Sequence, residues 1–592
     1  MLGKTDKKMA VIGIDGANPG TVKRLLKEGR LPNLAELKDR GSYGKLKTTH
    51  VSQSPVAWSS FQTGMNPAKH GIYDFIVRNA ETMALDLGLV RERVNAEGKS
   101  VYRKRILGDS IWHYLSAEEI PSISLFIPVT FPAEPIEGIQ ISGMGTPDVR
   151  GTQGVPTIYW SSEIAEEKED CRHIPLEEET ESTLMGPQGA LAPIKFSVSS
   201  KGILIEAGKE KKFVQQGEWS DWFFVDFDGT EGMFRAKVLR HSGKEIKIYV
   251  SPVIHSQLNP AVSIAQPKKI ASALFGKTGC FKCVSFESDV NALKEKLIAE
   301  KTWIEDMEYT FRQRVKTAEY LMENTDWNFF AADFFPVDRA QHLFWRYIDK
   351  KSPLFEEHGE YSQTIDRSYE LADEKLGALL GQCGKDCLTF VISDHGFMPY
   401  RKNVQLNKIL EQEGFLKMES GKSGFSNTDW GKTQAYALGF SSVYVNLEGR
   451  DRYGIVSEKD YESVRDSICS ALKKFSFDGA KPFRDAKKSE EIYSGPLLNE
   501  MPDILPIYNE GFRVEKTNVL GSFSEQEIVH DNLNKWSGDH IGPFLQETNQ
   551  GIIFCSQPLD LKDASIMDLA PTALQYFGLP ENKKMDGHSL LR

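Results

Sequence analysis

The chain has 592 residues, of which 40% are hydrophobic and 26% are charged, and its formal net charge is −11. This length exceeds what one small core needs and predicts several structural units. The acidic balance argues against binding to nucleic acid polymers, because phosphate backbones are held by basic surfaces. No apolar run is long enough to cross a membrane, and the seven cysteines form no disulfide pattern. We therefore expect a soluble, cytoplasmic protein without a membrane partner.

Short apolar runs alternate with helical stretches along much of the chain. The first run, residues 9–14, ends in Asp15-Gly16 and predicts a buried strand. Further strand-like runs occupy 45–51, 122–127, 328–335, 388–393 and 551–555. Helical patterns cover 20–40, 58–64, 288–324, 361–381 and 567–577. The alternation predicts an α/β fold with a mostly parallel sheet flanked by helices.

Two regions depart from this alternation. Residues 170–285 contain short strand-like runs and turns, which predict a β-rich inserted domain, and residues 400–535 are mixed. The predicted parts are an N-terminal core part (1–168), the β-rich insertion (169–287), a second core part (288–400), a mixed α/β subdomain near the active site (401–535) and a C-terminal core part (536–592).

Acidic and imidazole side chains follow several of the predicted strands. In open α/β sheets, ligands bind at the carboxyl ends of the strands. Asp15 follows the first strand, and Asp394-His395-Gly396 follows the strand at 388–393. Either segment alone also fits an ordinary turn. Together they are candidate metal ligands at one edge of the sheet.

Further candidate ligands stand on a predicted helix and in a loop. Asp338 and His342 have i, i+4 spacing, which places both side chains on one helix face where they could share a metal or form a surface ion pair. His540 stands in a loop before the strand-like run at 551, where a lone histidine is more often a surface residue.

Ser54 begins a predicted helix, with Pro55 in its first turn. A hydroxyl at a helix N-terminus lies near the positive end of the helix dipole, which suits a group that meets a phosphate. A plain N-cap serine is the alternative.

The order of these motifs resembles the type I phosphodiesterase / nucleotide pyrophosphatase branch of the alkaline phosphatase superfamily. The resemblance covers about two thirds of the chain and is carried by segments 11–16, 54–72, 336–342, 393–396, 538–540 and 566–587. It implies an alkaline phosphatase-like core. It also implies two divalent metal ions, with zinc favoured by the mix of nitrogen and oxygen ligands and manganese as the alternative.

Carried over by position, the resemblance assigns a role to each candidate. One metal would be held by Asp338, His342 and His540, and the other by Asp15, Asp394, His395 and the Ser54 oxygen. Ser54 would attack phosphorus and form a phosphoseryl intermediate. The implied activity is hydrolysis of a small phosphorylated substrate by a phosphodiesterase or nucleotide pyrophosphatase-like enzyme.

The sequence departs from related families at informative positions. Nucleotide pyrophosphatases usually have a threonine nucleophile and a later asparagine, where this chain has Ser54 and Phe75, and a phenyl ring cannot donate a hydrogen bond to phosphate. This departure puts nucleotide substrates in doubt. Val56 and Trp58 replace the proline and arginine of the sulfatase motif, which argues against a sulfatase. The remaining alternatives are a phosphomonoesterase, a phosphoglycerate mutase-like phosphotransferase and a binding protein with a relic site.

Overall fold

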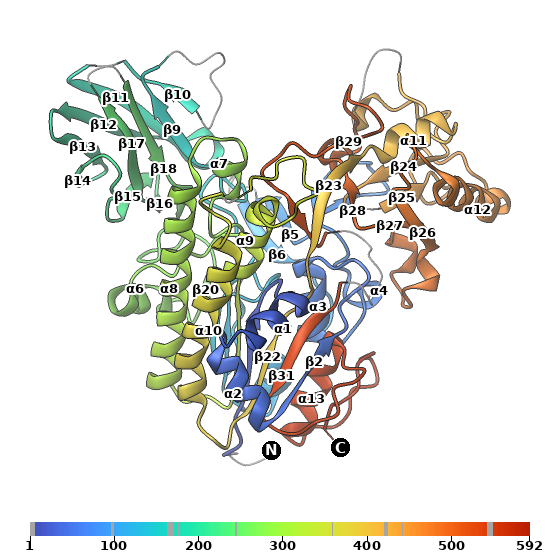
Figure 1. Cartoon of the computed structure of the whole chain (residues 1–592), viewed down its shortest axis with the longest axis horizontal. Helices are drawn as coiled ribbons and strands as arrows, with labels where there is room; N and C mark the ends of the chain where they lie inside the picture. The colour runs from blue at the N-terminus through green and yellow to red at the C-terminus, as the bar shows by residue number, and fades with distance from the viewer. Residues whose placement is uncertain are drawn as a thin grey trace. The chain divides into compact units, whose positions relative to one another are not determined.

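The computed structural model describes residues 6–95, 100–162, 171–175, 177–242, 245–357, 359–419, 424–440, 442–541 and 549–591 (Figure 1). The chain divides into two compact units. The first contains the residues up to Ser122 and from Trp327 onward, and the second runs from Ile123 to Asp326. The five-part division predicted from the sequence stays a prediction, and its boundary at 168/169 lies outside the described residues.

A mixed sheet forms the centre of the first unit. Its strands have the order β2 (Ser42–Leu46), β31 (Gly551–Cys555), β22 (Leu388–Ile392), β1 (Met9–Ile14) and β21 (Phe329–Phe334), and β2, β31 and β22 are labelled in Figure 1. Strand β1 is parallel to both β21 and β22, whereas β31 is antiparallel to β22 and to β2. Every residue of β1, β21, β22 and β31 is buried, as expected for strands covered on both faces. The predicted α/β class is confirmed, with a mixed sheet in which two of these four strand pairings are parallel and two are antiparallel.

Helices surround this sheet. The predicted helix at 20–40 is two helices, α1 (Pro19–Lys27) and α2 (Pro32–Arg40). The break is local chemistry, since Gly29 has a φ of +72° and Pro32 begins a new helix. The other α-helices of the core are α3 (Ser54–Thr63), α4 (Pro67–His70), α5 (Ile111–Ala117), α9 (Pro336–Phe344), α10 (Thr364–Cys383) and α13 (Leu569–Tyr576).

Helix α3 is buried along its whole length and is fixed at its carboxyl end by the C-terminal segment. It ends at Gly64, which has a φ of +69°. The Gly64 carbonyl accepts hydrogen bonds from the backbone N–H groups of Asp586 (2.7 Å) and Gly587 (3.1 Å). The Asp586 carboxylate also accepts from Asn66 and Lys69, just beyond the helix. Segments far apart in the sequence therefore hold α3 in place.

Smaller elements of the first unit include two β-ribbons and a group of strands that follows β22. The ribbons are β3 (Ile76–Arg78) with β4 (Leu85–Leu87), and β5 (Val90–Val94) with β6 (Ser100–Lys104). The strands that follow β22 are β23 (Met398–Val404), β28 (Gly511–Val514), β29 (Val529–Asp531) and β30 (Gly538–Asp539).

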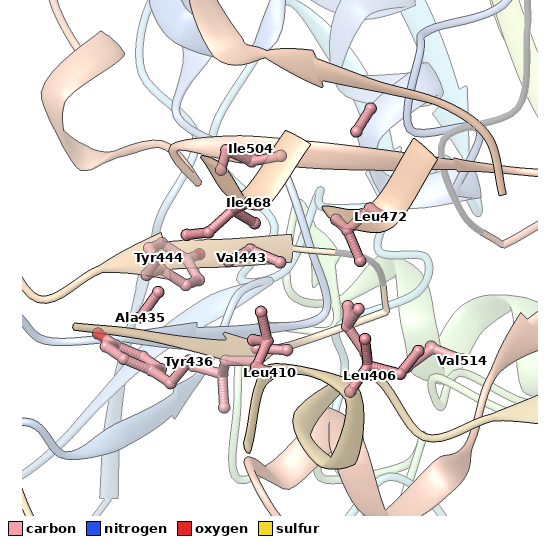
Figure 2. Close-up of a cluster of buried hydrophobic side chains, with 14 of the residues drawn as sticks. Leu406, Leu410, Ala435, Tyr436, Val443, Tyr444, Ile468, Leu472, Ile504 and Val514 are labelled. Atoms are coloured by element: carbon pink, nitrogen blue, oxygen red, sulfur yellow. The ribbon is translucent and has the colours of Figure 1, made fainter. Parts of the chain in front are cut away.

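The mixed region after residue 400 has a hydrophobic core of its own (Figure 2). Its antiparallel sheet has the order β24, β25, β27, β26, and helices α11 and α12 pack against it. Tyr436, Tyr444, Ile468 and Leu472 are almost wholly buried in this cluster. The element bounds are α11 Leu406–Gln412, β24 Ala435–Leu438, β25 Ser442–Val445, α12 Glu458–Lys474, β26 Phe483–Lys488 and β27 Ile504–Tyr508.

The second unit is rich in antiparallel sheet. Its sheets have the strand orders β10-β9-β18-β17, β11-β12-β13-β14 and β15-β16-β19. The strand bounds are β10 Cys171–His173, β9 Thr157–Trp160, β18 Glu245–Val250, β17 Ala236–Ser242, β11 Glu179–Met185, β12 Leu191–Ser199, β13 Gly202–Ala207, β14 Glu210–Val214, β15 Phe223–Phe227, β16 Thr230–Phe234 and β19 Ile254–His255. The region also holds β7 (Ser122–Leu125), β8 (Gly138–Ile141), β20 (Ala265–Gln266), α6 (Ile270–Thr278), α7 (Val290–Lys294) and α8 (Glu300–Asn324).

Buried ionic groups in the second unit have partners of opposite charge or hydrogen-bond donors. The Lys282 ammonium lies 2.7 and 2.9 Å from the two oxygens of Asp306, and both side chains are buried. Asp289 accepts a hydrogen bond from the Tyr249 hydroxyl at 2.8 Å. Such pairing offsets the cost of removing charge from water.

All seven cysteines are buried free thiols. Across the described part of the chain, none of the helices is both long enough and apolar enough to span a bilayer.

Candidate active site

The parallel arrangement of β1 and β22 brings their carboxyl ends to the same edge of the sheet. Asp15 follows β1 and Asp394 follows β22, and both carboxylates are fully buried. Between them, the Gly16 N–H lies 3.3 Å from Asp394 Oδ1. A Cβ on Gly16 would come within 3.0 Å of the Asp338 main chain, so glycine at this position allows helix α9 to approach closely.

Ser54 is the first residue of α3, and its side chain is directed at the acidic edge of the sheet. Its hydroxyl oxygen lies 3.4 Å from Asp15 Oδ1 and 3.2 Å from His395 Nε2. The residue is 3% exposed. The structure therefore places the predicted nucleophile against predicted ligands that follow two different strands.

Asp338, His342 and His540 form a compact group whose candidate ligand atoms all lie within 4.8 Å of one another. Asp338 and His342 are one turn apart on α9, as the spacing predicts, and His540 follows β30. Asp338 Oδ1 lies 3.4 Å from His342 Nε2 and 3.3 Å from His540 Nε2. All three residues are buried, so the loop histidine is not a surface residue.

A second group joins Asp15, Asp338 and His395, again with candidate ligand atoms within 4.8 Å of one another. Asp394 Oδ2 lies beside this group, 3.1 Å from His395 Nε2. Asp338 thus belongs to both groups, whereas the resemblance assigned it to one metal only. The structure brings all seven predicted site residues into one buried cluster: Asp15, Ser54, Asp338, His342, Asp394, His395 and His540.

Each imidazole in the cluster is oriented by a main-chain carbonyl. The Nδ1 atoms of His342, His395 and His540 lie 2.9, 3.0 and 2.6 Å from carbonyl oxygens of Gly538, Gly396 and Ser52. A carbonyl oxygen only accepts hydrogen bonds, so each Nδ1 carries the proton and donates it. The Nε2 lone pairs are then left facing the cluster, which is the arrangement of metal-ligating histidines.

The contacts among these Nε2 atoms favour a bound cation. His342 Nε2 lies 3.1 Å from His540 Nε2, and two neutral rings with these tautomers oppose two lone pairs across that distance. Within the described residues, Asp338 Oδ1 and Asp394 Oδ2 are buried and have no hydrogen-bond donor. Clustered acceptors without donors are satisfied by cations or protons, and the donor set of imidazole nitrogens and carboxylate oxygens fits zinc.

The electrostatics of the protein without metal agree with this interpretation. Burial, reinforced by Asp394 and other nearby carboxylates, raises the pKa of Asp15 well above its usual value. Burial likewise raises the pKa of Asp394 to about 7. For Asp338, burial acts to raise the pKa, but His342 and His540, whose Nε2 atoms can take up a proton in place of a cation, outweigh it together with Arg339 and hold the pKa well below the usual value. The concentration of buried acids in this site therefore favours the binding of a cation there.

Some supporting residues were missed by the sequence reasoning. The Trp58 indole donates to Asp15 Oδ2 at 3.0 Å and fixes that carboxylate. Trp536 stacks on the His342 ring with centroids 3.7 Å apart. Ser52 and Asn549 make buried hydrogen bonds around His540. Only Trp58 and Ser52, which flank Ser54 closely, carried any signal in the sequence.

The structure brings Asp and His residues together at the carboxyl edge of the sheet, beside a helix that begins with serine, which is the arrangement that the resemblance in the sequence implied. The model of the type I phosphodiesterase / nucleotide pyrophosphatase family matches residues 9–193 and 208–532, and the chain belongs to this family. The family consists of metal-dependent enzymes that hydrolyse phosphoric esters, and this chain is accordingly a phosphoric ester hydrolase.

Comparison with solved structures shows distant similarity over nearly the whole chain. Phosphonoacetate hydrolase from Sinorhizobium meliloti 1021, in complex with phosphonoacetate, is 13% identical with a TM-score of 0.46, covering 97% of this chain and 96% of that one. Human ectonucleotide pyrophosphatase / phosphodiesterase 5 is 9% identical with a TM-score of 0.43, covering 98% and 97%. The search of curated proteins finds no match.

Proposed function

We propose that the protein is a two-metal phosphodiesterase or nucleotide pyrophosphatase-like enzyme in which Ser54 is the nucleophile. One observation carries this proposal: the Ser54 hydroxyl lies in the same buried cluster as two overlapping groups of candidate metal ligands. A hydroxyl without such neighbours is a poor nucleophile, because its free pKa keeps it protonated.

The two groups define which residues would hold the metals. Asp338, His342 and His540 would hold one, while Asp15, Asp394, His395 and the Ser54 oxygen would hold the other, with Asp338 near both. Zinc fits this donor set best, and manganese is the alternative. When bound, these cations would favour the ionised form of the Ser54 hydroxyl and neutralise charge on the phosphate oxygens.

The residues of the chain then account for the steps. Ser54 Oγ gives its proton to solvent and bonds to phosphorus in line as the ester oxygen leaves and takes up a proton from solvent, which gives a phosphoseryl ester. Water cleaves this ester in a second in-line step and restores the serine hydroxyl. Two inversions leave the configuration at phosphorus retained. Trp58 keeps Asp15 in one orientation throughout by donating to its second oxygen.

The net charge of the chain and the character of Phe75 bear on the substrate class. We propose a small phosphorylated molecule, since the acidic surface disfavours a nucleic acid polymer. Phe75 packs edge-on against Phe440, with ring centroids 5.8 Å apart, and offers no hydrogen-bond donor for a phosphate oxygen. Free, buried thiols suit a reducing compartment, which supports a cytoplasmic location.

The direct experiment measures metal content and turnover on the same purified protein. We expect two divalent ions per chain and faster hydrolysis of bis-p-nitrophenyl phosphate than of p-nitrophenyl phosphate. Preference for the monoester would replace this proposal with a phosphomonoesterase. A protein that binds metal but turns over neither compound, nor pyrophosphate-linked nucleotides, would contradict the assignment.

A further inference from the structure

Ser52 stands two residues before Ser54 and contacts His540 at two points. Its main-chain carbonyl accepts the His540 Nδ1–H at 2.6 Å, and its hydroxyl donates to the His540 carbonyl at 2.7 Å. Both residues are buried, with exposed fractions of 1% and 2%. One residue of the nucleophile segment therefore fixes both the ring and the main chain of a candidate metal ligand.

Asn549 extends this link to the other candidate metal group. Its side-chain amide donates to the Ser52 hydroxyl at 2.8 Å and to the His540 carbonyl at 3.4 Å. Its main-chain carbonyl accepts the N–H of Gly396 at 3.1 Å. The Gly396 carbonyl, in turn, accepts from His395 Nδ1 at 3.0 Å. Asn549 is 1% exposed, so none of these contacts is shared with bulk water.

We propose that Ser52 and Asn549 are positioning residues that hold the nucleophile segment, His540 and His395 in one fixed arrangement. This inference rests on the proposed function. Ser52 and Asn549 would touch neither phosphorus nor metal, and would act only by positioning the residues that do. Ser52, on the segment that carries Ser54, bonds to His540 and to Asn549. Asn549 bonds to Gly396, whose carbonyl orients His395. The Ser54 segment and both imidazoles therefore belong to one hydrogen-bond network.

The donors in this network are not interchangeable. Loss of the Ser52 hydroxyl removes a donor to the His540 carbonyl but spares the main-chain bond that orients the imidazole ring. Loss of the Asn549 amide removes the donors to both Ser52 and His540. An Asn549→Asp change keeps the shape but substitutes an acceptor for the donor, opposite a carbonyl that can only accept. Changes to groups that orient metal ligands typically cost about 10- to 100-fold in metal affinity or activity.

The experiment compares Ser52→Ala, Asn549→Ala and Asn549→Asp with matched controls. Ser59→Ala deletes another buried hydroxyl of helix α3, one that donates to the Pro55 carbonyl. Asn446→Ala deletes a buried amide that donates to carbonyls of Thr433 and Tyr453, in the region after residue 400. Zinc affinity is measured by chelator competition, and kcat and KM are measured with bis-p-nitrophenyl phosphate. Ser52→Thr, which restores a hydroxyl, serves as the rescue variant.

We expect the Ser52 and Asn549 variants to bind zinc about 10-fold more weakly or worse, and to lose kcat more than KM rises. Asn549→Asp should be no better than Asn549→Ala, Ser52→Thr should recover most of the loss, and the two controls should match wild type. Wild-type zinc affinity and kcat in Ser52→Ala would overturn the inference, as would equal losses in the controls. Because zinc affinity is measured without turnover, a wild-type protein that binds zinc but hydrolyses no ester would contradict the proposed function and leave this test intact.

Discussion

Buried charge is treated differently in the two units of the molecule. In the second unit, Lys282 and Asp306 are both buried and form a direct ion pair. In the first unit, burial raises the pKa values of Asp15 and Asp394, and nearby carboxylates raise them further. A paired buried charge can be explained by folding alone, whereas a cluster of like charges costs stability unless something binds there. The contrast distinguishes the Lys282–Asp306 pair from Asp15 and Asp394, whereas Asp338 combines both features, because it lies in the acidic cluster and also pairs with Arg339.

The largest effect is expected at the nucleophile. Ser54→Ala should lower kcat for a phosphodiester by about 1,000-fold or more, because no other group would form the covalent bond to phosphorus. Metal content, measured by elemental analysis after dialysis, should stay near that of wild type. Substantial remaining turnover would mean that water attacks phosphorus directly.

The shared position of Asp338 predicts unequal consequences of ligand removal. Asp338→Asn should weaken both metals, since this carboxylate lies in both ligand groups, whereas His342→Gln should weaken only one. We expect losses of more than about 100-fold in affinity, beyond those seen when only supporting groups change. Metal per chain, titrated against chelator, distinguishes the two cases. Loss of a single metal in both variants would show that Asp338 serves one site only.

Breaking the Lys282–Asp306 ion pair of the second unit should lower the free energy of unfolding and leave the metal content unchanged. Asp306→Asn leaves Lys282 buried and without its counter-charge, which should cost about 3–5 kcal/mol in the free energy of unfolding. Thermal or denaturant unfolding measures the loss. The control is Lys211→Ala, which removes a surface pair with Glu206 and should change stability by about 1 kcal/mol or less. A change in bound metal in Asp306→Asn would contradict the separation between the two kinds of buried acid.

His255 provides the smallest predicted effect, a pH dependence within the second unit. Burial lowers the pKa of His255 to about 4 in the folded protein, against 6.5 for an ordinary histidine. Below pH 6.5 the His255 imidazole therefore binds a proton in the unfolded chain but not in the folded chain. The free energy of unfolding consequently falls as the pH drops. The loss between pH 7.5 and pH 5 should be about 2 kcal/mol. His255→Leu should flatten this slope in urea unfolding series at the two pH values; an unchanged slope would show that the pKa of His255 is the same in the folded and unfolded chains.

The sequence predicted the candidate ligands of the site better than it predicted their supports. Asp15 and Asp394 could be found because acids directly after buried strands meet at one sheet edge. His342 could be found from its helical spacing to Asp338. The orienting carbonyls of Ser52 and Gly538 could not be found, because every residue has a main-chain carbonyl and the sequence does not show which of them bonds to an imidazole. Asn549 was missed for the same reason, since its role depends on contacts with segments far away in the chain.

The α/β class was also predictable, but local breaks and sheet edges were less so. The alternation of apolar runs located β1, β21 and β22 within a residue or two of their observed bounds. A single helix was expected at 20–40, where Gly29 and Pro32 divide it. The antiparallel pairing of β31 with β22 also escaped prediction, because the direction in which a strand runs depends on tertiary connections and not on its own pattern.

The contact between Gly64 and the segment at 586–587 has a consequence for biosynthesis. Helix α3 is made early, yet the carboxylate of Asp586, which accepts a hydrogen bond from Asn66 just beyond this helix, stands 520 positions after Asn66. The carboxyl end of α3 can therefore be held in place only after the segment at 586–587 has been translated.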